Sequence, residues 1–367
     1  MAFIIIVSIY SALIIVLAFG FARLEEKTEP KDMHIYSISV VVPVRNEGDN
    51  TCRLLDHLSH IKYPKEKWEV ILIDDHSTDD GIENIDVNFY DFRINKLSLN
   101  TTFGKKAAIT AAIEVAKGDI ILTTDADCTV GPLWIEKVNL TFQDAHTQMI
   151  IGGVRIQETK TFFSRLQSLE FVSVAATGAA TLGLGFPTMC NAANLAYRRD
   201  AFTEVDGYKG NERVSSGDDE FLMNKFKKSS VKFLYDQDTL VTTSPRPDVT
   251  SFFHQRLRWA GKWSSNTSIS TQIFAIVVWL FHLAFILMTF SAVFGFISWK
   301  LFAILAGAKG FVESLFLIPA ANFFRVNWRW ISFLVLQFVY SFYVISVGFM
   351  SQILLPEWKG RAVETKV

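Results

Sequence analysis

The run ISVVVPV, residues 38–44, is followed at once by the polar residues RNEGD, 45–49. A continuous β-branched run is typical of a strand that is buried on both faces of a sheet. The same pattern occurs twice more: WEVILI at 68–73 before DDHSTD at 74–79, and DIILTT at 119–124 before DAD at 125–127. Helical patterns lie between these runs, and the order strand, polar loop, helix, strand predicts a doubly wound, Rossmann-like α/β sheet.

The three polar clusters share one feature, which is that each follows the carboxyl end of a predicted strand. Ligands of open α/β sheets bind beyond the carboxyl ends of the strands. We therefore expect the three clusters to lie together at one edge of the sheet and to form the functional site.

The composition indicates a membrane protein. The net charge of −1 argues against nucleic acid as a partner, and half of the 367 residues are hydrophobic. Residues 2–21 carry no charge and match the ~20 residues that a helix needs to cross a bilayer. A cleavable signal peptide is the alternative, but the run lacks a basic start and is long for that role, which favours a retained anchor.

Four regions follow from this pattern: a transmembrane anchor at 1–22, an α/β domain at 34–265, a transmembrane region of two or three helices at 270–356, and a basic tail at 357–367. Three later segments are long enough to span, at 272–298, 301–324 and 330–355. The middle segment contains Lys309 and Glu313 four residues apart, so a re-entrant or interior-facing position is the alternative for it.

Positive charge near the helix ends predicts the orientation. Basic residues flank the α/β domain on both sides: Arg23, Lys27 and Lys31 before it, and Arg256, Arg258 and Lys262 after it. This places the domain in the cytoplasm, and the basic tail favours an even number of later crossings. Three cysteines without metal-ligand spacing fit a reducing compartment.

Asp125 and Asp127 place two carboxylates on one predicted turn. Mg²⁺ and Mn²⁺ prefer oxygen ligands, usually one or two carboxylates together with substrate phosphates. Turns supply such pairs frequently without any metal. The position directly after a buried strand favours the metal site.

The other candidates each have a structural alternative. Asp74 and Asp75 cap a turn or accept a hydrogen bond from a nucleobase. Lys105 binds phosphate or is simply solvated. Asp218 and Asp219 follow Gly217 and either begin a helix or supply a general base.

Taken together, PVRNE, IDDHSTD, DAD, GDDEFL and QRLRW occur in an order and spacing that resemble the family 2 glycosyltransferases, and more narrowly the membrane-anchored members with a (Q/R)xxRW signature. The helix arrangement looks like that of the ceramide glucosyltransferase and glycolipid glycosyltransferase branch. The resemblance covers roughly residues 38–263. It implies a GT-A fold, a nucleotide-sugar donor and an inverting displacement assisted by a divalent metal, Mg²⁺ or Mn²⁺.

The resemblance also implies roles for single residues. Asp74 and Asp75 would hold the uridine, Asp125 would approach the sugar and ribose, Asp127 would bind the metal, and Asp219, beside Asp218, would be the base. Pro43, Arg45, Glu47 and Lys105 would complete the donor site. The sequence departs from the pattern at Asp218, where many relatives have Glu, and at His76, where Gly is common.

The stretch HQRLRWAGKW, 254–263, contains the last motif. Gln255, Arg258 and Trp259 are three and four positions apart, so one face of a helix presents all three. We expect this face to close the site, with arginine suited to phosphate and indole to a sugar or lipid. Arg256 and Lys262 are expected to point elsewhere, as cations at the membrane surface.

Residues 162–185 are apolar and small, apart from Arg165 and Glu170. They predict either a buried core helix or a helix in the membrane plane that leads a lipid to the site. Asn191 and Asn194 are candidates for the lining of an acceptor pocket.

The leading hypothesis is an integral membrane enzyme of a bacterial inner membrane that transfers one sugar from a UDP-sugar to a lipid acceptor at the cytoplasmic face. A processive polysaccharide synthase is the runner-up, and a catalytically degenerate membrane scaffold is the alternative outside the enzymes. The expected partners are the UDP-sugar, the lipid acceptor and the bilayer, with no nucleic acid; the oligomeric state is left open.

Overall fold

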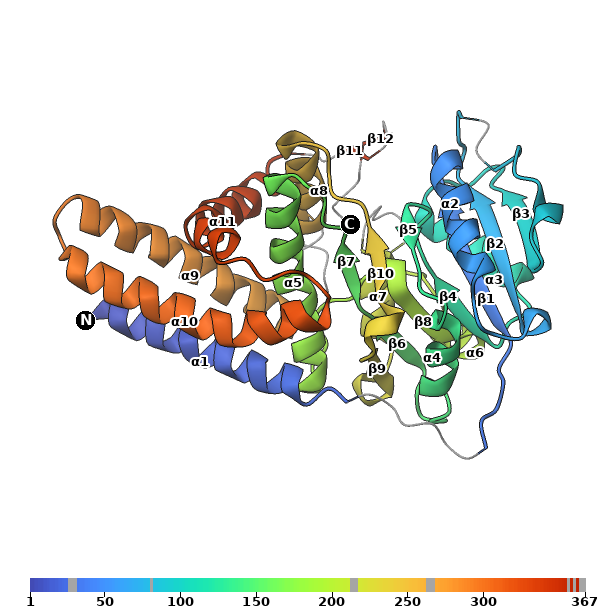
Figure 1. Cartoon of the computed structure of the whole chain (residues 1–367), viewed down its shortest axis with the longest axis horizontal. Coiled ribbons are helices and arrows are strands. Elements are labelled where there is room, and N and C mark those ends of the chain that lie inside the picture. Colours follow the sequence, from blue (N-terminus) through green and yellow to red (C-terminus); the bar gives the residue numbers. More distant parts are fainter. Residues whose placement is uncertain are drawn as a thin grey trace. The chain divides into compact units, whose positions relative to one another are not determined.

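The computed structural model describes residues 1–25, 32–79, 82–211, 217–261, 268–354, 357–358 and 361–362. The chain folds as two compact units. The sheet unit comprises Glu25–Gln157 and Met189–Ser244, and the helical unit comprises Met1–Leu24, Glu158–Thr188 and Pro245–Val367 (Figure 1). The expected 34–265 domain is thus divided between the two units. Its residues Glu158–Thr188 and those from Pro245 onward belong with the long apolar helices.

The sheet unit contains a seven-stranded mixed sheet of the expected α/β class, in the order β3-β2-β1-β4-β8-β6-β9. Its strands are β1 Ile38–Val44, β2 Trp68–Asp74, β3 Arg93–Ser98, β4 Ile120–Thr123, β6 Met149–Gly152, β8 Leu195–Arg198 and β9 Val231–Leu234. Strands β1 to β4 are parallel, whereas β8 runs antiparallel to both β4 and β6. The three strands predicted from β-branched runs are therefore confirmed as neighbours in the parallel half.

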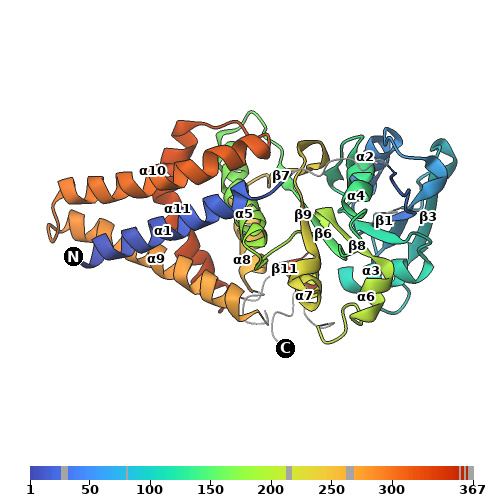
Figure 2. The same ribbon diagram turned by 90° about the horizontal axis from the view of Figure 1, so that it is seen from below.

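Helices cover both faces of this sheet, which explains why its central strands are apolar throughout. The helices α2 Gly48–Ser59 and α4 Trp134–Thr141 lie over one face, and α3 Lys105–Val115 and α6 Arg199–Glu204 over the other (Figure 2). Val40, Val41 and Val42 of β1 are fully buried. Each such burial contributes roughly 1.5–3 kcal/mol to folding.

A second sheet has three strands and is connected to the first sheet through the turn at 124–127. Its strands are β5 Cys128–Thr129, β7 Val154–Ile156 and β10 Val241–Thr243, with β10 in the centre. Strand β5 pairs antiparallel with β10 through Cys128 and Thr243. The turn at 124–127 therefore has a strand of a different sheet at each end, which fixes its backbone.

Among the described residues of the helical unit, four helices are long and apolar enough to cross a membrane. They are α1 Ala2–Ala22, α9 Ile269–Val293, α10 Trp299–Phe323 and α11 Trp330–Met350. The unit also contains α5 Phe162–Gly183 and α8 Val249–Gly261, and β11 Glu357–Trp358 pairs with β12 Arg361–Ala362. Lys309 and Glu313 of α10 are 2% and 8% exposed, so this charged pair faces the interior of the helical unit.

Helices α1, α9 and α10 run alongside one another, whereas α11 lies across them (Figures 1 and 2). Tyr10 of α1 marks one level of the bundle, because it contacts both Glu313 of α10 and His282 of α9.

Helix α11 stays near that level over half of its length. Its Gln337 binds Glu313, its Ser341 binds His282, and its Gly348 packs against Trp279, one turn of α9 away from His282.

Helix α5 packs closely on α1 at a pair of glycines. A Cβ on Gly183 would lie 2.1 Å from the carbonyl oxygen of Gly20, so no larger residue fits there. More than half of the residues of α5 are buried. This burial fits the core-helix alternative for residues 162–185.

Candidate active site

Three predicted polar clusters lie at the carboxyl edge of the parallel strands, as expected. The register pairs Val44 of β1 with Asp74 of β2, and Val41 of β1 with Thr123 of β4. The loops that follow these three strands therefore leave the sheet on the same side. Pro43 is the second-last residue of β1 and is partly buried in this edge.

Asp75 is the most buried acid of the edge, at 2% exposure. One of its carboxylate oxygens accepts a hydrogen bond from the Gly104 amide at 3.1 Å. The Arg45 guanidinium donates to the carbonyl oxygens of Asp75 and His76, at 2.7 and 3.1 Å. Arg45 thus supports the backbone that carries Asp75.

Asp74 and His76 shape the turn on either side of Asp75. Asp74 accepts a hydrogen bond from the Ser77 amide at 3.0 Å, so its turn-capping alternative is confirmed. His76 has a φ of 57°, a left-handed conformation in which glycine is unstrained. The imidazole stacks on the ring of Phe103, with centroids 4.1 Å apart.

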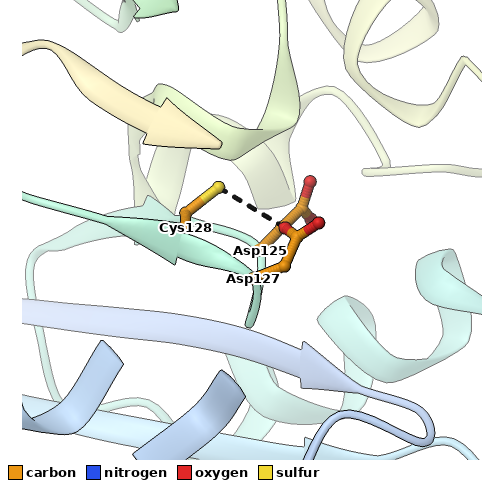
Figure 3. A group of neighbouring side chains, drawn as sticks. All are labelled: Asp125, Asp127 and Cys128. Atoms are coloured by element: carbon orange, nitrogen blue, oxygen red, sulfur yellow. Dashed lines mark hydrogen bonds between the residues drawn. The ribbon is translucent and has the colours of Figure 1, made fainter. Parts of the chain in front are cut away.

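Asp125 and Asp127 lie on the turn between β4 and β5 and are partly exposed (Figure 3). One carboxylate oxygen of each aspartate and the Sγ of Cys128 all lie within 4.8 Å of one another. The Cys128 amide closes the turn on the Asp125 carbonyl at 3.1 Å. Two carboxylates converging on one point are a donor set that suits Mg²⁺ or Mn²⁺.

Cys128 is a member of this group that the cysteine spacing did not predict. The thiol donates to Asp127 Oδ1 at 3.7 Å, and burial, Asp125 and Asp127 raise its pKa. A thiol held in the neutral form is a poor ligand for a hard cation. The position of Cys128 directly after Asp127 was the signal in the sequence that could have identified it as a member of this group.

Residues Gly104 and Lys105 connect the Asp75 and Asp125 clusters. While the Gly104 amide binds Asp75, the Lys105 Nζ donates to Asp125 Oδ1 at 2.5 Å. Two adjacent residues at the start of α3 thus contact the carboxylates of residues that follow β2 and β4 in the chain. The Lys105 side chain is 22% exposed, so it is partly accessible at the site.

Asp219 is joined to the same edge through Ala192. The Ala192 amide donates to Asp219 at 3.2 Å, and the Ala192 carbonyl accepts from the Thr123 hydroxyl, at the end of β4, at 2.6 Å. Asp219 lies in the first turn of α7 Asp218–Lys225 and also accepts from the Glu220 amide at 2.8 Å. The side chain of Asp218 lies outside the described residues.

Glu47 directly precedes α2 and contacts residues of the first turn of that helix. Its carboxylate accepts from the Asn50 amide group, and its carbonyl accepts from Thr51 at 2.8 Å. The predicted contact of Glu47 with a donor stays a prediction.

The prediction that Asn194 lines a pocket is wrong. Asn194 is 1% exposed, accepts from the Trp134 indole at 2.9 Å and donates to the carbonyls of Gly153 and Thr239. It therefore ties three segments of the core together. Asn191 is partly buried and caps the helical turn Ala192–Asn194.

Gln255, Arg258 and Trp259 lie in the helical unit on α8 and are partly buried there. The expectation that Arg256 is a cation at the membrane surface is wrong. Its guanidinium is 3% exposed and binds the Glu170 carboxylate of α5. Burial opposes its charge, but Glu170 and Tyr343 outweigh burial and raise the pKa of Arg256. Lys262 lies outside the described residues.

Comparisons with known proteins place the sheet unit in context. The sequence profile described as "Glycosyl transferase family 2" matches residues 39–206, somewhat less than half of the chain. The relatives include an undecaprenyl-phosphate 4-deoxy-4-formamido-L-arabinose transferase of Proteus mirabilis, 28% identical over 41% of this chain and 46% of that protein. They also include an N-acetylglucosaminyltransferase of Mesorhizobium japonicum, 26% identical over 65% of this chain and 58% of the relative. The chain thus spans about half the length of these curated relatives.

A solved structure has the same fold over nearly the whole chain. It is a mannosyltransferase from Pyrobaculum calidifontis in complex with GDP-Man and Mn²⁺. The TM-score is 0.59 at 14% identity, with 97% of each chain covered. This likeness shows the fold.

Proposed function

We propose that this chain, whose residues 39–206 form a glycosyl transferase family 2 domain, is a metal-dependent, inverting enzyme that transfers one sugar from a UDP-sugar to a membrane lipid. The observation that carries the proposal is the connected group of acids at the sheet edge. Asp75, Asp125 and Asp219 come from three distant parts of the chain and are linked by Gly104, Lys105 and Ala192. Asp127 lies beside Asp125 in the same group.

The donor would bind along this edge. Asp75 is held by a backbone amide beside the stacked His76 and Phe103 rings, an arrangement suited to a nucleobase that offers an N–H and a flat face. Lys105, already near Asp125, would offer its charge to the diphosphate. The two relatives and the structural neighbour are named as sugar transferases, and the neighbour is bound to GDP-Man and Mn²⁺.

A divalent ion held by Asp127 and Asp125 would neutralise charge that develops on the departing diphosphate. Asp219 would accept the proton of the acceptor hydroxyl, so that the oxygen attacks the sugar carbon from the face opposite the diphosphate. One such displacement inverts the anomeric centre. Arg258, with Gln255 and Trp259, is assigned to this site from its motif; a planar guanidinium suits a diphosphate.

The lipid acceptor is supported by the helical unit and by the relatives. Four helices are long and apolar enough to cross a bilayer. The Proteus mirabilis relative is named for a lipid phosphate, undecaprenyl phosphate. We propose that the acceptor is a membrane lipid with a free hydroxyl or phosphate oxygen, and that the reaction takes place on the cytoplasmic side.

The full chain, purified in detergent, tests this function when it is incubated with UDP- and GDP-sugars and a lipid extract. Mass spectrometry should detect a lipid that has gained a single sugar, formed from a UDP-sugar. Long polymer ladders would establish the processive synthase instead, and no product from any donor would leave a non-catalytic scaffold. A chelator should abolish turnover, and Mn²⁺ or Mg²⁺ should restore it.

A further inference from the structure

A buried ion pair joins α8 to α5 within the helical unit. Arg256 and Glu170 are 3% and 4% exposed, and Nε of Arg256 donates to Glu170 Oε1 at 3.1 Å while Nη2 binds Oε2. The Tyr343 hydroxyl of α11 donates to the same carboxylate at 3.2 Å. Three helices therefore meet at one carboxylate.

The guanidinium of Arg256 also contacts two residues of the QRLRW motif. Arg256 Nη1 donates to the side-chain oxygen of Gln255 at 2.7 Å. The guanidinium lies 4.3 Å from the ring centre of Trp259 and 4.4 Å from that of Phe252. Gln255 is thereby held with its oxygen turned toward Arg256, and the Trp259 ring has a cation at its face.

Stability alone does not account for this pair. Removing two charges from water costs several kcal/mol for each ion, and a pair of apolar residues of similar size is often at least as stable. An apolar pair, however, would neither orient an amide by a hydrogen bond nor attract an indole face. What distinguishes the pair is the geometry that it imposes on Gln255 and Trp259.

We propose that Arg256 and Glu170 are positioning residues, which fix the orientation of Gln255 and Trp259 for the transfer reaction. The inference rests on the proposed function and extends it to two buried residues. Glu170 locks the guanidinium through two hydrogen bonds. The locked guanidinium then determines which way the Gln255 amide and the Trp259 ring face.

Two variants separate positioning from folding. Arg256→Lys keeps the positive charge but lacks the planar guanidinium with its several N–H donors. A single amine cannot hold both Glu170 oxygens and Gln255 in the same way. We expect kcat to fall about a hundredfold, as for a misplaced site residue, with an unchanged KM for the nucleotide sugar. The exchange Glu170→Arg with Arg256→Glu restores an ion pair, and therefore the folded yield, but puts a carboxylate beside Gln255 and removes the cation from Trp259. Its kcat should stay low.

The matched control is the other buried ion pair of the unit, Lys309–Glu313, which does not touch α8 among the contacts described. The exchange Lys309→Glu with Glu313→Lys should leave kcat within about twofold of the wild type. If the Glu170/Arg256 exchange recovered wild-type kcat, or if the control lost as much activity, the pair would be merely structural and the proposal would be overturned.

Fluorine NMR of the fluorotryptophan-labelled chain gives a readout that does not depend on turnover. The Trp259 resonance is assigned by its loss in Trp259→Phe. It should shift in Arg256→Lys and in the Glu170/Arg256 exchange but not in the control exchange. An unmoved Trp259 resonance would overturn the positioning role, whereas a wild-type chain without transfer activity would overturn only the proposed function.

Discussion

Two acids of the helical unit and three of the sheet unit are held in different ways. In the helical unit, Glu170 and Glu313 are almost fully buried and each is surrounded by donors. In the sheet unit, Asp125, Asp127 and Asp219 are partly exposed at the edge where the strands end. The side chain of Asp125 is 39% exposed and forms an ion pair with Lys105.

This difference teaches how to tell a structural acid from a candidate ligand. The carboxylate of Glu313 accepts from Tyr10 at 2.6 Å, from Lys309 at 2.9 Å and from Gln337 at 2.7 Å, which leaves little capacity for anything else. A partly exposed carboxylate that shares a turn with another retains sites for a metal ion or a donor. Burial with full hydrogen bonding indicates assembly, and partial exposure in a group indicates binding.

The largest effect is expected for Asp127→Asn. Loss of one of the two proposed metal-binding carboxylates should lower turnover about a thousandfold, which corresponds to roughly 4 kcal/mol. Because Asp127 is partly exposed, the free energy of unfolding should change by no more than about 0.5 kcal/mol. The measurements are product formation and thermal unfolding of the same preparation.

Asp91→Asn is the matched control for that variant. Asp91 is 70% exposed and forms a surface ion pair with Lys65 at 3.0 Å. It should leave both quantities unchanged, since such pairs contribute little. Equal turnover of the Asp127 and Asp91 variants would refute the metal-binding role of Asp127.

Glu313→Leu should have the opposite profile. It leaves the Lys309 cation buried without its partner, which costs about 3–5 kcal/mol of stability. The double variant Lys309→Met with Glu313→Leu should recover most of this loss, because no unpaired charge remains. Unfolding in a detergent series measures both; a double variant as unstable as the single one would contradict this account.

Gly183→Val tests packing without charge in the same unit. The new Cβ would collide with the Gly20 carbonyl, which cannot rotate away, so we expect a loss of about 1–3 kcal/mol. Gly307→Ala in α10 is the control, since nothing lies within 4 Å of its added Cβ. The alanine should raise stability by roughly 0.5–1 kcal/mol through its higher helix propensity.

The smallest effect is a difference in alkylation rate between two cysteines, and no change in stability is involved. Cys128 is buried and its pKa is raised, whereas Cys52 is exposed. At neutral pH less of the Cys128 thiol is ionised, so alkylation should be at least about tenfold slower than at Cys52. Mass spectrometry of the labelled peptides measures the two rates; comparable rates would show that the thiol beside Asp127 is accessible.

The parallel strands and their polar edge could be predicted because both signals are local. A β-branched run identifies a buried strand, and the residues that follow it must lie at its end. Parallel pairing then brings Asp75 and Asp125 to one edge, whichever strand order the sheet adopts. The carboxylate pair of Asp125 and Asp127, which is the proposed metal site, follows in the same way.

The errors concern residues whose position depends on distant partners. Helical periodicity predicted that Arg256 points away from Gln255 and Trp259, which is wrong, because its guanidinium contacts both residues. It could not reveal Glu170, which is 86 residues away and converts an expected surface cation into a buried one. Asn194 likewise binds segments more than 40 residues distant, so its amide is used up inside the core.

The oblique path of α11 has a consequence for where the chain emerges from the bilayer. From Gln337 to Gly348 this helix stays near one depth of the bundle, so this stretch does not carry the chain to the other side. We therefore expect three crossings, with Met1 and the loop between α9 and α10 facing one compartment and Ser351 facing the other. An epitope tag after Ser351 should be protected from an impermeant label that reaches a tag at Met1, because the two would lie on opposite surfaces of a sealed vesicle.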